Sequence, residues 1–194
     1  METPDILEIA ASAIGTFIES EQELFAADVN ERSLSARLAI HLQRCFPSWH
    51  VDCEYNRLGD GIKRLPQAEE TRTDDRRGRT IYPDVIIHRR GERVNLLVIE
   101  IKKHDNDDTE RDEAKLRGLT APDGEYAYRY GIHLIFDCSR GVVCNAMVYN
   151  EGRIDERLSL WMKFRLAASE GRAAVENAMA EFRRLTQEKG KKQQ

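Results

Sequence analysis

The stretch YPDVIIHRRGERVNLLVIEIKK, residues 82–103, is the most informative part of this sequence. Two apolar runs flank a turn at Gly91-Glu92, a pattern typical of two antiparallel strands. The second run is almost continuously apolar, as expected for a central strand that is buried on both faces. Glu100 interrupts it, and strand alternation places Glu100 and Lys102 on the same face. Such a carboxylate costs several kcal/mol unless it is paired or metal-bound. On this Glu-x-Lys pattern alone, an ordinary ion pair on a half-exposed strand is the favoured interpretation.

Asp84 changes that balance because it begins the first of the two strands. Facing residues of an antiparallel hairpin have a constant index sum, and a sum of 184 sets Asp84 opposite Glu100 with Cβ atoms ~5 Å apart. A strict two-residue turn gives a sum of 183 and places the two carboxylates on opposite faces. A carboxylate pair therefore requires an odd-numbered turn or a bulge. Such a pair would repel unless a hard divalent cation such as Mg²⁺ bound between its oxygens.

Glu31 is a third candidate acid, at the start of a helix expected over residues 31–45. Asn30 is a good N-cap residue, and Leu34, Leu38 and Leu42 lie within about 60° of Glu31 around the helix axis. Glu31 therefore faces inward. An acid in the first turn also complements the helix dipole, so a purely structural role remains equally open.

The remaining pattern predicts a mixed α/β domain with a central sheet. The expected elements are a helix at 5–25, the helix at 31–45, a strand at 49–55, a long polar loop at 58–79, the two strands at 82–90 and 94–103, a helix near 113–119, strands at 131–138 and 141–149, and helices over 154–189.

Composition bounds the answer further. The chain has 194 residues, 41% hydrophobic and 33% charged, which fits one domain over 1–194. No apolar run approaches the ~18 residues of a membrane helix, and the acidic start METPDILEIA does not resemble a secretory signal. The four cysteines lack CxxC spacing, which favours free thiols in the cytoplasm and argues against zinc. The net charge of −4 means that any nucleic-acid surface would be local.

Pro83-Asp84 followed by Glu100-Ile101-Lys102, after a helix with an inward acid, resembles the PD-(D/E)xK nuclease superfamily. The resemblance covers about residues 30–150 and includes element order as well as motif. It extends to small bacterial members through ERSLSARLAIHLQRCFP and WHVDCEYNR. It implies a restriction-endonuclease-like fold: a mixed central sheet of about five strands flanked by helices, with extra N- and C-terminal helices, the latter at about 154–189.

The resemblance also implies roles for individual residues. Asp84 and Glu100 match the metal-ligating carboxylates, with the Ile101 backbone carbonyl as a further ligand. Lys102 matches the lysine that orients the attacking water and stabilises charge on the phosphate. Glu31 matches the helix acid that ligates through water or holds a second ion. The expected cofactor is Mg²⁺, with Mn²⁺ as a substitute, and the expected reaction is phosphodiester hydrolysis that leaves a 5′-phosphate.

Several further residues allow two interpretations. A basic set could contact nucleic-acid phosphates or form a solvated charged surface; it comprises Arg72, Arg76, Arg77, Arg79 and Lys103. The acidic run from Asp105 to Glu113 is expected to serve the start of a helix and face solvent. His88 is expected to be half-exposed, and the tyrosines at 126, 128 and 130 to be core residues rather than base-stacking platforms. Lys115 is a candidate to face the active site.

The sequence therefore predicts a metal-dependent nuclease that acts on DNA and could work as a homodimer. Two alternatives stay open: a non-catalytic nucleic-acid-binding or scaffold protein that keeps the fold, and an effector that a protein partner activates. Intact Asp84, Glu100 and Lys102 count against a scaffold, which has no need of buried like charges. DNA is the expected substrate, and RNA is the alternative.

Overall fold

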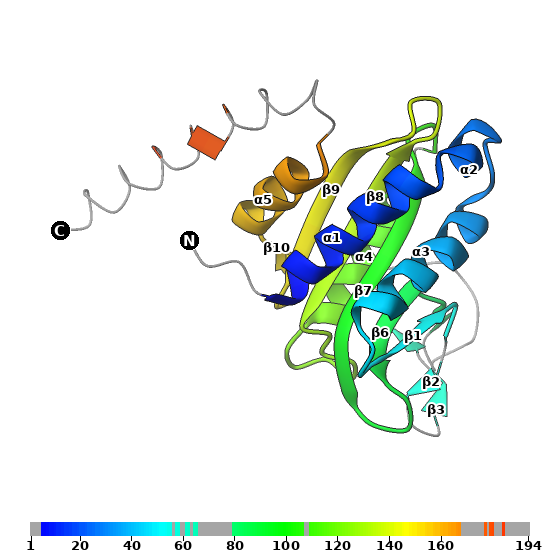
Figure 1. Ribbon diagram of the computed structural model, residues 1–194. Coiled ribbons are helices and arrows are strands. Elements are labelled where there is room, and N and C mark those ends of the chain that lie inside the picture. The colour runs from blue at the N-terminus through cyan, green and yellow to red at the C-terminus, as the bar shows by residue number, and fades with distance from the viewer. Residues whose placement is uncertain are drawn as a thin grey trace.

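The computed structural model describes residues 5–55, 79–106 and 109–167, together with positions 57–58, 61–62, 64–65, 177, 179–180 and 184. The fold is α/β, with a six-stranded mixed sheet flanked by helices (Figure 1). The strands of this sheet are β1 (His50–Cys53), β6 (Val85–Arg89), β7 (Val94–Lys103), β8 (Tyr130–Asp137), β9 (Val142–Asn150) and β10 (Arg153–Ile154). The helices are α1 (Asp5–Ser20), α2 (Gln22–Ala26), α3 (Glu31–Cys45), α4 (Glu110–Thr120) and α5 (Glu156–Leu166).

Strand order in the sheet is β1-β6-β7-β8-β9-β10. All neighbours are antiparallel except β7 and β8, which run parallel and are connected through α4. Two small antiparallel pairs lie outside this sheet: β2 (Arg57–Leu58) with β3 (Gly61–Ile62), and β4 (Arg64–Leu65) with β5 (Arg79–Thr80). The expected mixed sheet with flanking helices is thus confirmed, with β10 as an additional short edge strand.

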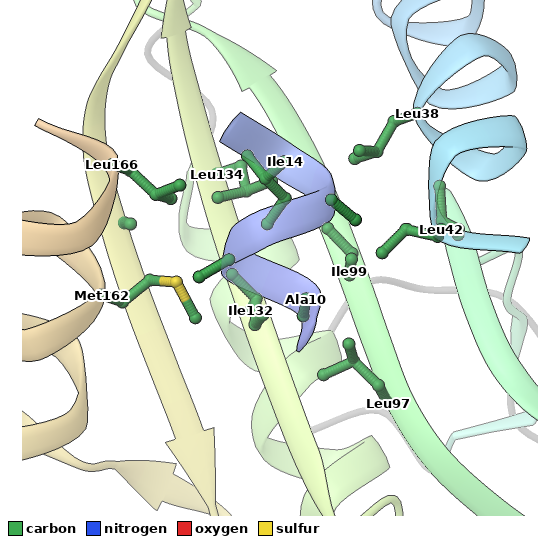
Figure 2. Close-up of a cluster of buried hydrophobic side chains, with 14 of the residues drawn as sticks. Ala10, Ile14, Leu38, Leu42, Leu97, Ile99, Ile132, Leu134, Met162 and Leu166 are labelled. Atoms are coloured by element: carbon green, nitrogen blue, oxygen red, sulfur yellow. The ribbon is translucent and has the colours of Figure 1, made fainter. Parts of the chain in front are cut away.

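The two faces of the sheet have separate hydrophobic cores. Helices α1, α3 and α5 cover one face, where Leu97, Ile99, Ile132 and Leu134 of the central strands pack against them (Figure 2). Helix α4 covers the other face, and its core includes Ile86, Val98, Leu116, Leu119 and Tyr149. Strand β7 supplies alternate residues to both cores, as its nearly continuous apolar sequence predicts.

A β-bulge decides the register of the β6–β7 hairpin. Next to the turn, His88 pairs with Asn95 at an index sum of 183, the register of a two-residue turn. The register then shifts between Ile87 and His88, and the pairs from Ile87 to Val85 have a sum of 184. Continued by one residue, this register sets Asp84 across from Glu100. Of the two alternatives that the sequence leaves open, the structure therefore adopts the bulge.

One helical expectation needs correction, and another is tested only in part. The helix expected over 5–25 breaks at Glu21, whose carboxylate is held by Arg37 and His41 of α3, and the following α2 turns to bury Phe25. The C-terminal helical pattern begins as α5, while most of 168–189 lies outside the described residues.

Two further findings bear on the class of protein. Among the helices that the structure describes, none is both long and apolar enough to cross a membrane. All four cysteines are free, and only Cys138 is buried.

Candidate functional site

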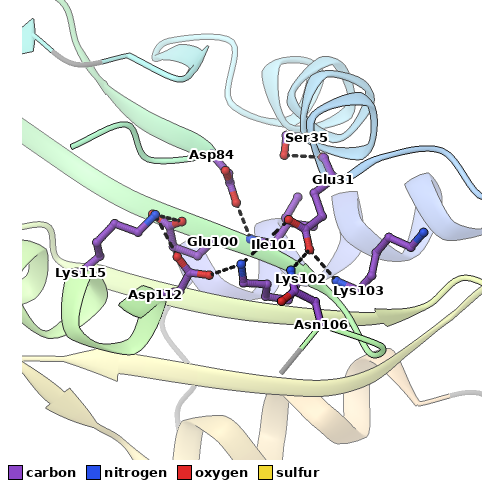
Figure 3. A network of polar contacts seen from close by, with 10 residues as sticks. All are labelled: Glu31, Ser35, Asp84, Glu100, Ile101, Lys102, Lys103, Asn106, Asp112 and Lys115. Atoms are coloured by element: carbon purple, nitrogen blue, oxygen red, sulfur yellow. Dashed lines mark hydrogen bonds and ion pairs between the residues drawn. The ribbon is translucent and has the colours of Figure 1, made fainter. Parts of the chain in front are cut away.

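The predicted acids meet at one end of the central sheet. Asp84 precedes β6, Glu100 and Lys102 lie on β7, and Glu31 is the first residue of α3 (Figure 3). The bulge puts Asp84 on the face that carries Glu100. The Asn30 side chain accepts a hydrogen bond from the Ser33 amide at 2.9 Å, and this N-cap fixes the helix start from which Glu31 projects.

Asp84 is anchored to the strand that carries Glu100. Its Oδ2 accepts a hydrogen bond from the backbone N–H of Ile101 at 2.7 Å. This bond forms just before β6 begins, so the carboxylate satisfies an amide that has no partner in the β6–β7 ladder. The side chain is thereby held beside β7 while Asp84 remains partly accessible.

Glu100 is almost completely buried, with 1% of the residue exposed. Its Oε2 accepts from Lys115 Nζ of α4 at 2.5 Å. Its Oε1 is buried and has no hydrogen-bond partner among the described residues. A buried carboxylate oxygen without a donor is costly, and it marks a position where a bound cation would be favourable.

Asp112 connects the two lysines of the site. Its Oδ1 lies 3.0 Å from Lys115 Nζ, and its Oδ2 lies 3.1 Å from Lys102 Nζ. Asp112 is 5% exposed, so the expectation that this acidic run faces solvent is wrong for Asp112. The reason is helical geometry: Leu116 and Leu119 lie within about 60° of Asp112 around α4, so the face that packs on the sheet carries the acid with it.

Glu31 reaches the end of β7 from the other side of the sheet. Its Oε1 accepts from the backbone N–H of Lys103 at 3.0 Å and from the Asn106 side chain at 3.3 Å. Its Oε2 lies 4.0 Å from Lys102 Nζ. The contacts thus form a chain of alternating charge from Glu100 through Lys115, Asp112 and Lys102 to Glu31.

Burial and mutual repulsion shift the pKa values of the acids. Burial raises the pKa of Asp84 to about 6, against the opposing effect of the Ile101 amide. Burial, and then the nearby Asp84, raise the pKa of Glu100 well above its ordinary value. Burial would also raise the pKa of Asp112, but Lys115 and Lys102 outweigh it and lower that pKa. For Lys115, burial is outweighed by Glu100 and Asp112, which raise its pKa and keep the ammonium charged.

The raised pKa of Asp84 predicts a pH dependence in metal-free protein. The folded state binds the proton more tightly than the unfolded chain, so this stabilisation is present at low pH and is lost as pH rises through about 6. Asp84→Asn cannot titrate. Its free energy of unfolding in EDTA should therefore gain about 2–3 kcal/mol relative to wild type between about pH 4 and about pH 8. Urea unfolding of both proteins across this range measures the difference, and parallel pH curves would contradict the raised pKa.

Side chains could supply only some of the ligands that a divalent cation would need here. Among the described residues, no group of three or more His, Cys, Asp and Glu side chains is arranged to hold a metal ion. Asp84 and Glu100 supply two carboxylates, which suit Mg²⁺ or Mn²⁺, and further positions would fall to the Ile101 carbonyl, to water or to substrate oxygens. The carboxylates of Glu31, Asp84, Glu100 and Asp112 carry −4 when ionised, and Lys102 and Lys115 carry +2, which leaves −2.

Most residues of the predicted basic surface lie outside the described part of the chain. Arg72, Arg76 and Arg77 are outside the described residues, and Arg79 begins the short strand β5. Lys103 lies on the face of β7 opposite Lys102, and its ammonium is paired with Asp28. Nucleic-acid contact by this set stays a prediction.

Other residues weighed from the sequence are now placed. Tyr126 and Tyr128 are buried core residues of the α4 face, as expected. His88 is buried rather than half-exposed: its Nε2 lies 2.9 Å from Asp52 Oδ2, and its ring centroid lies 4.7 Å from that of Tyr55. Lys115 faces the site through Glu100, as the sequence suggested.

His133 is a member of this neighbourhood that the sequence analysis missed. It lies on β8 in register with Glu100, is fully buried, and has both ring nitrogens without a hydrogen-bond partner among the described residues. Burial lowers its pKa, which favours the neutral ring. Its strand carried no charge pattern that could have singled it out.

Comparison with known proteins adds no family to this picture. No family model matches the sequence, and no curated protein matches it significantly.

Proposed function

We propose that this chain is a Mg²⁺-dependent nuclease of the PD-(D/E)xK type that hydrolyses phosphodiester bonds, with DNA as its substrate. The observation that carries the proposal is the bulged register, which sets Asp84 beside Glu100 on one face while Glu100 Oε1 has no partner among the described residues. Two carboxylates held together in a buried place are unfavourable without a cation, and this arrangement is what a metal-ligating pair requires.

The sheet order around the site supports a restriction-endonuclease-like fold. In the proposed assignment, the acid helix is α3, the Asp strand is β6, the Glu-x-Lys strand is β7, and α4 with β8 completes the core. The parallel β7–β8 pair through α4, flanked by antiparallel strands, is a mixed sheet of the expected kind. The additional helices α1 and α5 both pack on the α3 face, opposite the face of β7 that carries Glu100 and Lys102.

Each residue of the site has a separate role in this proposal. Asp84 and Glu100 bind the cation, and Glu31 holds the adjacent backbone at Lys103 while its second oxygen faces Lys102. Lys102 orients the attacking water and stabilises the charge that develops on the phosphate. Bound Mg²⁺ supplies Lewis acidity, which activates water and offsets negative charge on the phosphate oxygens. Helix α4 supplies the Asp112 carboxylate that positions Lys102.

A cleavage panel tests the proposal. Purified chain is incubated with linear duplex, circular duplex and single-stranded DNA and with RNA, each in Mg²⁺, Mn²⁺ and EDTA. The proposal expects metal-dependent cleavage of DNA with 5′-phosphate ends. Cleavage of RNA alone would overturn the choice of substrate. A chain that binds nucleic acid but cleaves no substrate with either metal would favour the non-catalytic or partner-activated alternatives.

Lys102→Ala should separate metal binding from hydrolysis. The variant keeps Asp84 and Glu100 and removes a positive charge near the cation, so Mg²⁺ should bind at least as tightly as in wild type. The rate of cleavage should fall by about a hundredfold or more, because the group that stabilises phosphate charge is gone. Calorimetry with Mg²⁺ and single-turnover cleavage measure the two effects. Loss of metal binding with Lys102, or full retention of activity, would contradict the role given to this lysine.

A further inference from the structure

Lys115 occupies a position between two acids that a metal ion could otherwise bridge. Its ammonium lies 2.5 Å from Glu100 Oε2 and 3.0 Å from Asp112 Oδ1 (Figure 3). Glu100 and Asp112 are both almost fully buried, and the Lys115 side chain is 16% exposed. Helix α4 packs on the sheet through Leu116 and Leu119, and this packing positions the Lys115 ammonium between the two acids.

The two ends of the Glu100 carboxylate are therefore unequal. Oε2 is taken by Lys115, whereas Oε1 is buried and without a partner among the described residues. Asp112 is also committed, with one oxygen toward Lys115 and the other toward Lys102. Among the oxygens of Glu100 and Asp112, Glu100 Oε1 is the one without a partner among the described residues, and it remains for a cation on the face of the sheet that Asp84 shares.

We infer that Lys115 is a built-in cation that takes the place of a second divalent ion. This inference rests on the nuclease function proposed above. The site binds a single Mg²⁺ at the Asp84–Glu100 end. The net charge of the site agrees with one ion. The ionised carboxylates of Glu31, Asp84, Glu100 and Asp112 and the two ammonium groups of Lys102 and Lys115 sum to −2, which one divalent ion neutralises. Removal of the Lys115 charge leaves −3 and frees Glu100 Oε2 and Asp112 Oδ1, which makes a second ion favourable.

Counting bound ions tests the inference without any activity measurement. The full chain is titrated with Mg²⁺ by calorimetry and with Mn²⁺ by electron paramagnetic resonance, and wild type should bind one ion. Lys115→Gln and Lys115→Met should each bind two. Lys115→Arg keeps the positive charge and should stay at one. The double variant Lys115→Gln with Asp112→Asn loses the second ligand and should return to one.

Lys103→Gln is the matched control, because it removes a neighbouring lysine charge whose partner is Asp28 rather than Glu100. It should stay at one ion. Two ions in wild type, or one ion in a folded Lys115→Gln or Lys115→Met protein, would overturn the inference. If neither variant folds, the wild-type number alone decides. A wild type that binds no divalent ion would overturn the nuclease proposal as well, so the two failures are distinguishable.

Discussion

Asp84→Ala is expected to lower the rate of phosphodiester cleavage by on the order of a thousandfold without unfolding the protein. The variant removes one of the two carboxylates that are proposed to bind Mg²⁺ and leaves the Ile101 amide without its side-chain acceptor. It also relieves the repulsion that contributes to the raised pKa of Glu100, so the fold should tolerate the change. Single-turnover cleavage on the preferred substrate of the panel measures the loss, and circular dichroism checks the fold.

The matched control for this experiment is Asp123→Ala, an exposed aspartate in the turn that follows α4. It changes the same residue type and the same formal charge beyond the C-terminal end of α4, whereas Asp112 and Lys115 of the site lie in the first two turns of that helix, so its cleavage rate should equal that of wild type. If Asp84→Ala cleaves as fast as Asp123→Ala, the proposed role of Asp84 is wrong.

Asp112→Ala should have the largest effect on stability, a loss of about 3 kcal/mol in the free energy of unfolding. The carboxylate bridges two lysine ammonium groups that are each largely buried. The expected loss lies at the lower end of the range for a broken buried ion pair, because Lys115 keeps Glu100 and Lys102 keeps Glu31 as partners. Urea unfolding in EDTA measures it without interference from metal binding.

Glu113→Ala is the control on the same helix. Glu113 is a neighbouring, partly exposed acid that lies 3.9 Å from Arg117, so its removal should change stability by no more than about 0.5 kcal/mol. Equal effects of the two substitutions would show that the Asp112 bridge contributes no more than a surface charge does.

The sequence predicted the main elements because their patterns are local. Alternation and apolar runs located β6, β7, β8 and β9 to within a few residues, and the Asn30 cap located the start of α3. The break at Glu21 was not predictable in this way, since the contacts that accompany it come from Arg37 and His41 of α3. Helical periodicity continues through Glu21, and no local signal opposes it.

The register of Asp84 and Glu100 depended on a feature that sequence parity alone left open. The bulge follows Asn95. Its side-chain amide donates to the backbone carbonyl of Tyr126 at 2.7 Å, and its backbone carbonyl accepts from the backbone N–H of Arg129. These contacts hold the beginning of β7 against the segment that leads into β8. The register shift is therefore accompanied by contacts with a segment about thirty residues away in the chain, and the hairpin sequence alone does not indicate those contacts.

Asp112 could have been found from the sequence by the test that was applied to Glu31. Both acids lie in the middle of an apolar stripe, Glu31 with Leu34 and Leu38, Asp112 with Leu116 and Leu119. The density of acids around Asp112 hid the pattern, because a run of charges normally indicates a solvated surface. Helical periodicity separates Asp112 from the other acids of the run, because it places Asp112 on the inward face, with Lys115 three residues later.

Thermal melts with EDTA and with Mg²⁺ test directly whether Asp84 and Glu100 together bind a divalent cation. Wild type should gain ~2.7 kcal/mol when Mg²⁺ is present at a hundredfold excess over its dissociation constant, because only the folded state presents the two carboxylates together. Asp84→Ala should lose most of that gain. If Mg²⁺ shifts the melting temperature of wild type and of Asp84→Ala equally, Asp84 is not a metal ligand and the mechanism proposed for this site is wrong.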